Sequence, residues 1–177
     1  GYACAVPRLK RQLADAGIVV DRGHPLFLYL PCGVGGAPGG IAFAARHMFG
    51  DDVHCFFVEP VEAPCMTLGM LTGRHSGISV YSLGLRLKTD ADGLAVSTPS
   101  RFIGQLMDPL LDGCCTLGDG TLYRHLRDLY ETERIEVEPS AAAGCGVPAA
   151  LCATDTGRAY LERHGLARVL PRASHIV

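Results

Sequence analysis

One short stretch constrains the fold more than any other part of this chain. Residues 28–43 read LYLPCGVGGAPGGIAF, an apolar run followed by five glycines and then by a helical pattern. The apolar run PLFLYL at 25–30 is typical of a strand that is buried on both faces of a parallel sheet. Pro38 suits the first turn of a helix that continues through IAFAARHMF. Strand, glycine loop and helix therefore predict the start of an α/β unit.

The glycine loop itself predicts an anion site. Backbone N–H groups are free at the positive end of a helix, and glycine lets an anion approach them without a Cβ in the way. Starting from Gly33, the sixth position of the dinucleotide fingerprint is Pro38 and not glycine. Gly40 is followed by IA, whereas the mononucleotide loop needs Lys and then Ser or Thr. We interpret the loop as a phosphate site; the alternative is that its glycines only allow close packing of helix and strand.

Strand and helix patterns alternate along the rest of the chain. Helices are expected over residues 6–16, 63–73, 101–111, 119–133 and 140–151, and strands over 53–60, 78–83 and 135–140. Residues 85–96 predict a loop near a ligand, and the closing HIV resembles the start of a buried strand. This order indicates an α/β fold with an open, mostly parallel sheet flanked by helices. In such a fold, the ligand lies at the carboxyl ends of the strands.

Composition excludes several function classes. The chain has 177 residues, 48% of them apolar, as is typical of a globular protein. Its formal net charge is −2 and its basic residues are scattered, so neither nucleic acid nor a membrane is an expected partner. The eight cysteines form no CxxC pair, and we interpret most of them as reduced, buried thiols. These features, with no long apolar run, predict a cytoplasmic protein that acts on a small molecule.

The seven histidines do not indicate a site of their own. They show no HxH or HExxH spacing, which gives little support to a metal centre. In GRHSG at 73–77, histidine stands where a nucleophile elbow needs serine. We interpret the histidines as structural.

Five segments together resemble one enzyme family. PCGVGGAPGGIAF, HCFFVEPVEAPCM, ADGLAV, LLDG and IEVEPSAAAG are similar, in this order and spacing, to the D-serine dehydratases (D-serine ammonia-lyases). These are pyridoxal-phosphate enzymes of fold type II, the tryptophan-synthase-β fold. The resemblance runs from Gly1 to Val177. It implies that residues 1–177 form the cofactor-binding (large) lobe of a pyridoxal-phosphate-dependent lyase and are incomplete at both ends. The complete enzyme would convert D-serine to pyruvate and ammonia by α,β-elimination.

The resemblance also assigns the phosphate of pyridoxal 5'-phosphate to the glycine loop. The backbone of Gly33, Val34, Gly35, Gly36 and Ala37 would hold it. The family usually has glycine where this chain has Ala37. The loop-based phosphate prediction and the family-based one therefore fall on the same residues.

Two further segments are implied to border the cofactor ring. Asp92 and Gly93 match a loop whose backbone lies beside the ring, and Glu138 matches the glutamate of the family's EPSA motif. For Glu138 the alternative is a charge at a helix N-terminus, which stabilises a helix by about 0.3–1 kcal/mol.

A cation site is implied beside the cofactor. Glu59, the main-chain oxygen of Ala63 and Cys65 match the place where enzymes of this fold hold a cation. Hard oxygen ligands suit a monovalent or alkaline-earth ion. The alternative for Glu59 is a capping or surface carboxylate at a strand end.

The lysine that such an enzyme needs for its Schiff base is missing from the expected place. The chain has only Lys10, in a basic helix face, and Lys88, in a polar loop after the glycine loop. In the family, this lysine precedes the glycine loop in an SxKxRG-like segment. We therefore assign no catalytic residue and expect the chain to be inactive alone. Two alternatives stay open: a non-catalytic phosphate- or nucleotide-binding α/β module, and a degraded gene product without a ligand.

Overall fold

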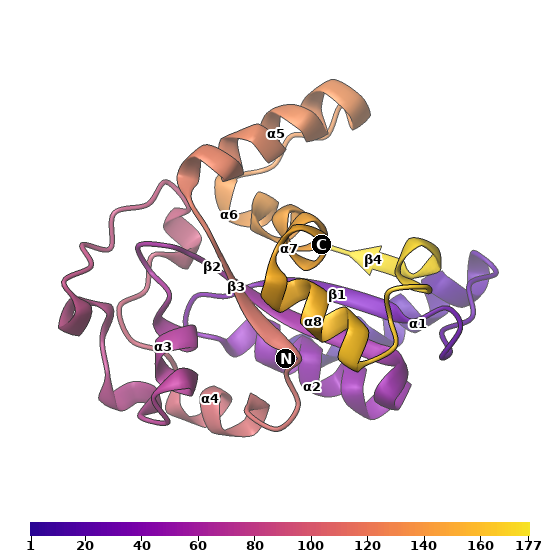
Figure 1. The fold of residues 1–177 in the computed structure, drawn as a ribbon, viewed down its shortest axis with the longest axis horizontal. Coiled ribbons are helices and arrows are strands. Elements are labelled where there is room, and N and C mark those ends of the chain that lie inside the picture. Colours follow the sequence, from indigo (N-terminus) through magenta and orange to yellow (C-terminus); the bar gives the residue numbers. More distant parts are fainter.

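The structure is a computed structural model that describes residues 1–177. Its centre is a four-stranded parallel sheet in the order β3-β2-β1-β4 (Figure 1). The strands are β1 (Leu26–Pro31), β2 (Val53–Pro60), β3 (Gly113–Leu117) and β4 (Ser174–Ile176). The α-helices are α1 (Ala5–Asp15), α2 (Gly36–Phe49), α3 (Cys65–Leu71), α4 (Arg101–Met107), α5 (Asp119–Glu133), α6 (Pro139–Ala142), α7 (Val147–Ala153) and α8 (Asp155–Arg163). Seven short 3₁₀ helices lie between them: Tyr2–Cys4, Gly50–Asp52, His75–Gly77, Val80–Leu83, Asp92–Leu94, Ala143–Gly146 and Leu170–Arg172.

Helices cover both faces of the sheet, and strand β1 shows why. Leu26 and Leu28 belong to a core cluster with buried side chains of α1 to α4, and the intervening Phe27 and Tyr29 belong to a second cluster with side chains of α5, α7 and α8. Successive side chains of a strand point to opposite faces, so a run without polar residues needs a core on each side. Figure 1 shows α2 and α4 on one side of the sheet and α7 and α8 on the other. The predicted α/β class is confirmed.

The connection from β1 through α2 to β2 positions the glycine loop. Leu26 pairs with Val53 at one end of the two strands and Pro31 pairs with Val58 at the other. The loop follows directly, since the Cys32 N–H donates to the Val58 carbonyl oxygen at 2.8 Å before the glycines begin. The loop therefore lies at the carboxyl edge of the sheet, where ligands of open parallel sheets bind.

Two predicted strands are wrong and one strand was not predicted. Residues 78–83 contain a 3₁₀ helix, Val80–Leu83, and residues 135–138 have no regular structure before α6 begins at Pro139. Neither segment has a strand beside it with which to pair. The third strand is Gly113–Leu117, whose sequence GCCTL is short and only half-buried.

The other expected elements are present; the strand over 53–60 and the helix over 119–133 have the predicted bounds, and the rest have shifted ends. The helix expected over 101–111 ends at Met107, and the one expected over 140–151 is divided by a 3₁₀ turn at Ala143–Gly146. The closing HIV contributes to β4, which pairs with β1. No helix is both long and apolar enough to span a bilayer.

The double-sided core makes a testable statement about stability. Phe57 of β2 is fully buried, and we expect Phe57→Ala to lower the free energy of unfolding by about 3–5 kcal/mol because it removes core contacts and leaves a cavity. Phe102→Ala is the matched control, since the Phe102 side chain is 70% exposed. Urea denaturation of both variants measures the difference. Equal losses would contradict a fully buried Phe57 side chain.

Candidate functional site

The glycine loop has a backbone that only glycine accommodates at its centre. Gly35 precedes α2 with a φ of 106°, in the left-handed region. A Cβ on Gly35 would also collide with the terminal methyl group of Met66, and one on Gly39 would meet Ile103 Cγ2 at 2.6 Å. These contacts bring the start of α2 close to α3 and α4. The packing alternative therefore accounts for two of the five glycines.

The N–H groups of the loop are free. Gly33, Val34, Gly35, Gly36 and Ala37 donate no backbone hydrogen bond within the protein. A Cβ added to Gly36 would have no heavy atom within 4 Å, so the outer side of this residue is open. Five consecutive donors at the start of a helix of 14 residues fit a phosphate group, which accepts several hydrogen bonds and is stabilised at the positive helix end.

Carbonyl groups of the loop accept hydrogen bonds from the protein, and this orientation turns the N–H groups of the loop outward. The Gly33 carbonyl oxygen accepts from the thiols of Cys32 and Cys65, each at 3.6 Å. The Val34 carbonyl oxygen accepts from the Ser100 N–H at 3.0 Å. Because the C=O and N–H of one peptide unit point in opposite directions, these contacts direct the next N–H groups outward.

The structure brings the two predicted ring-bordering segments to the same place. A Cβ on Gly33 would lie 3.1 Å from the Gly93 carbonyl oxygen, and a Cβ on Gly93 would lie 3.6 Å from Glu138 Oε1. The Gly93 N–H donates to Ser140 Oγ at 3.1 Å, which ties this loop to α6. Glu138 is exposed and precedes α6. The three segments are adjacent, while their contacts with a cofactor stay a prediction.

Glu59 is fully buried at the end of β2, where it caps α3. Its two carboxylate oxygens accept from the N–H groups of Met66 and Thr67 at 2.7 and 2.8 Å, and Oε2 also accepts from the Thr67 hydroxyl. Burial raises the pKa of Glu59, and the bonds from Thr67 and Met66 oppose that rise. The Ala63 carbonyl oxygen accepts from the Cys65 N–H at 2.9 Å. Of the alternatives, capping is confirmed and a surface position is wrong, while the cation site stays a prediction.

The chain has two lysines, Lys10 and Lys88. Lys10 Nζ is 6.0 Å from the ring centroid of Phe49, the last residue of α2, whereas the loop precedes the first residue of that helix. Lys88 is exposed in the connection before α4. The eight cysteines are all free, and burial raises the pKa of the thiols of Cys32 and Cys65, so these side chains stay neutral.

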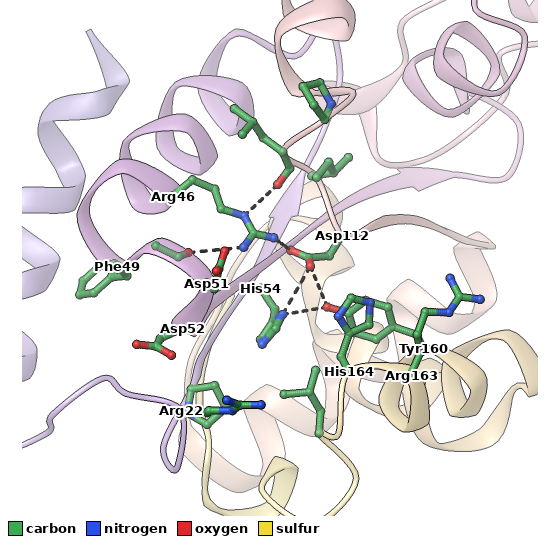
Figure 2. Close-up of a pocket in the computed structure, with 16 residues that line it drawn as sticks. Arg22, Arg46, Phe49, Asp51, Asp52, His54, Asp112, Tyr160, Arg163 and His164 are labelled. Carbon is green, nitrogen blue, oxygen red and sulfur yellow. Dashed lines mark hydrogen bonds and ion pairs between the residues drawn. The ribbon is translucent and has the colours of Figure 1, made fainter.

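A second polar cluster, which the sequence did not reveal, lies at the opposite edge of the sheet (Figure 2). Asp112, just before β3, accepts from Arg46 of α2, the Cys55 N–H at 2.7 Å and the Tyr160 hydroxyl at 2.8 Å. His54 Nδ1 lies 2.8 Å from the Tyr160 oxygen and 3.4 Å from Asp112 Oδ1. These residues are far apart in the sequence, so no spacing pattern could identify them.

Comparison with known proteins gives the family. The sequence pattern of the family described as "Pyridoxal-phosphate dependent enzyme" matches residues 2–158. That range contains the glycine loop, the Gly93 loop and the start of α6. The chain belongs to this family of pyridoxal-phosphate dependent enzymes.

The chain is also similar to individual known proteins. The chain is 51% identical over 176 residues to a probable D-serine dehydratase of Geobacillus stearothermophilus, an alignment that covers 99% of the chain and 38% of the relative. Among solved structures, it resembles a fungal L-serine ammonia-lyase from Rhizomucor miehei with a TM-score of 0.71, at 20% identity and covering 100% of the chain and 50% of that structure. A serine racemase from Dictyostelium discoideum has a TM-score of 0.66, at 19% identity, covering 100% and 47%. The chain spans about two fifths of the length of the curated relatives it matches.

The Asp112 cluster predicts how stability depends on pH. Burial tends to raise the pKa of Asp112, but the hydrogen bonds from His54, Cys55 and Tyr160 and the charge of Arg46 hold it below its ordinary value. A carboxyl whose pKa is lower in the folded state adds stability above its unfolded pKa of about 3.9, and this stability is lost as the pH falls through the folded value.

We expect Asp112→Asn to lower the free energy of unfolding at pH 7 by about 3 kcal/mol, because Arg46 keeps no carboxylate partner. Below pH 4 the difference from the wild type should shrink. Asp15→Asn, at an exposed position of α1, serves as the control. Urea denaturation at several pH values measures both. A loss that is independent of pH would contradict the assigned direction.

Proposed function

We propose that residues 1–177 form the cofactor-binding lobe of a D-serine dehydratase, whose complete form converts D-serine to pyruvate and ammonia. One observation supports this most directly: five consecutive free N–H groups open a helix in a chain of the pyridoxal-phosphate family. The D-serine assignment rests on the 51% identity to a probable D-serine dehydratase, which spans 99% of the chain. The partner is accordingly a small amino acid.

The residues of this chain would hold and border the cofactor. The N–H groups from Gly33 to Ala37 would bind its phosphate, and the closeness of Gly93 to both Gly33 and Glu138 supports a place for the ring beside them. When bound, pyridoxal phosphate supplies an electron sink that makes the α-proton of an amino acid removable. Glu59 would act indirectly, because it fixes the start of α3, whose Met66 contacts the loop. A monovalent or alkaline-earth cation near Glu59 remains part of the proposal.

The group that removes the proton lies outside this chain in our proposal. Lys10 lies near the last residue of α2, and Lys88 is exposed in a connection that follows the loop, whereas the family's lysine precedes it; we therefore place the Schiff-base lysine in another part of the complete protein. The chain alone would bind the cofactor without catalysing the reaction. Eight free thiols also suit a reducing compartment such as the cytoplasm.

Phosphate binding can be tested on this chain with pyridoxine 5'-phosphate, which has no aldehyde to react with Lys10 or Lys88. We expect it to raise the melting temperature; a free concentration of 100 Kd stabilises the folded state by about 2.7 kcal/mol. Gly36→Asp should weaken binding by about tenfold or more, because its carboxylate would lie among the donors. An Asp at a helix start favours the helix, so the fold should survive.

Gly118→Asp is the matched control, since Gly118 precedes α5 and a Cβ there meets nothing within 4 Å. It should bind as the wild type does. An unchanged melting temperature of the wild type, or equal binding by Gly36→Asp, would contradict the assignment of the loop. Inorganic phosphate that stabilises as strongly as pyridoxine 5'-phosphate would instead favour a simple phosphate-binding module.

A second experiment addresses the lysine in the complete natural protein. Borohydride reduction followed by digestion and mass spectrometry should place a pyridoxyl group on a lysine outside residues 1–177. The reason is that Lys10 lies near the last residue of α2, away from the phosphate donors, and that Lys88 is an exposed side chain in a connection after the loop. A tag on Lys88 or Lys10, or no tag at all, would overturn the proposed division of the site.

A further inference from the structure

A cavity of about 1020 Å³ lies at the end of the sheet where the parallel strands begin, away from the glycine loop (Figure 2). His54 of β2, Asp112 before β3 and Tyr160 of α8 contribute to its wall. Its volume is just above the range of about 300–1,000 Å³ that small-molecule sites occupy. The proposed dehydratase function uses none of these side chains.

The hydrogen-bond network assigns the protons of this wall. A proton must lie between the Tyr160 oxygen and Asp112 Oδ1, which are 2.8 Å apart, because an ionised carboxylate only accepts. Tyr160 uses its single proton there. The 2.8 Å contact between the Tyr160 oxygen and His54 Nδ1 therefore needs a proton on Nδ1. In neutral imidazole the lone pair is then on Nε2, which is an acceptor.

Nε2 of His54 is the one nitrogen of this side chain that the protein leaves without a partner. The side-chain hydrogen bonds of His54 all involve Nδ1. The residue is only 6% exposed and lines the cavity, and the protein does not bury Nε2 completely. A nearly buried acceptor that opens into a cavity is complementary to a ligand that donates a hydrogen bond.

Charges of both signs flank this acceptor. Figure 2 shows Arg22 and Asp52 on the His54 side of the cavity, while Arg163 lies beyond Tyr160. Arg22, Asp52, Asp51 and Arg163 make no ion pair within the protein, whereas Arg46 and Asp112 neutralise each other. Asp51, His164 and Arg163 complete the titratable groups of the wall. A pure anion would be repelled by Asp52 and a pure cation by Arg22, so a ligand with both charges fits best.

We propose that this cavity binds a zwitterion of the α-amino acid class. Its ammonium group donates to His54 Nε2 and pairs with Asp52, and its carboxylate pairs with Arg22. The volume leaves room for a long side chain, so the site recognises the ammonium and carboxylate groups of the ligand more strictly than the length of its side chain. The site is distinct from the glycine loop, which lies at the other edge of the sheet.

The test reads the imidazole directly. Long-range ¹H–¹⁵N correlation spectra of the ¹⁵N-labelled chain should show His54 with its proton on Nδ1. Addition of L-serine or L-methionine should move the Nε2 resonance, because this nitrogen starts to accept a hydrogen bond. Glycerate, which has a hydroxyl in place of the ammonium group of serine, and ethanolamine, which lacks the carboxylate, should each bind at least about tenfold more weakly.

Surface variants test the two charges without disturbing the buried network. Arg22→Gln and Asp52→Asn should each weaken L-serine binding by about tenfold or more. Arg8→Gln and Asp15→Asn are matched controls on α1 and should leave the affinity unchanged. The proposal is overturned if neither amino acid moves Nε2, if glycerate or ethanolamine binds as tightly as serine, or if both cavity variants bind like the wild type. Because the readout is His54, these outcomes do not depend on whether the glycine loop binds phosphate.

Discussion

The parallel pairing of β1 with β2 is the interaction on which the rest of the structure depends. Six residue pairs, from Leu26 with Val53 to Pro31 with Val58, fix the register of these two strands. Their side chains anchor a core on each face, so helices must cover both sides of the sheet. The same pairing places the glycine loop at one edge and His54 at the other. Both sites are consequences of this one ladder.

The glycine loop shows how packing prepares a backbone for a ligand. The thiols of Cys32 and Cys65 and the N–H of Ser100 occupy the loop carbonyls, and the free N–H groups are directed away from the core. The donors are thus arranged before any anion arrives, which lowers the ordering cost of binding. Pre-arranged donors at a helix start suit the family to which the chain belongs.

Sequence patterns predicted the strands that are buried on both faces of the sheet. They failed where a strand depends on a neighbouring strand with which to pair. The runs at 25–30 and 53–60 predicted two central strands, which are present, because burial on both faces leaves no polar position. The patterns at 78–83 and 135–140 predicted strands that lack a pairing partner. Gly113–Leu117 became a strand because one side of β2 was free to pair with it. Whether a segment forms a strand therefore depends more on a neighbouring strand that is free to pair than on its own strand propensity.

The sequence by itself determined the α/β class, the central strands and the position of the glycine loop, because each follows from residues that are neighbours along the chain. It also indicated the family, through five short segments whose order and spacing the family shares. Only the tertiary structure decided that Gly93 adjoins both Gly33 and Glu138, that Glu59 caps α3, and that His54 lines a cavity. Those arrangements depend on segments that meet only after the sheet has formed, and no local pattern encodes such contacts.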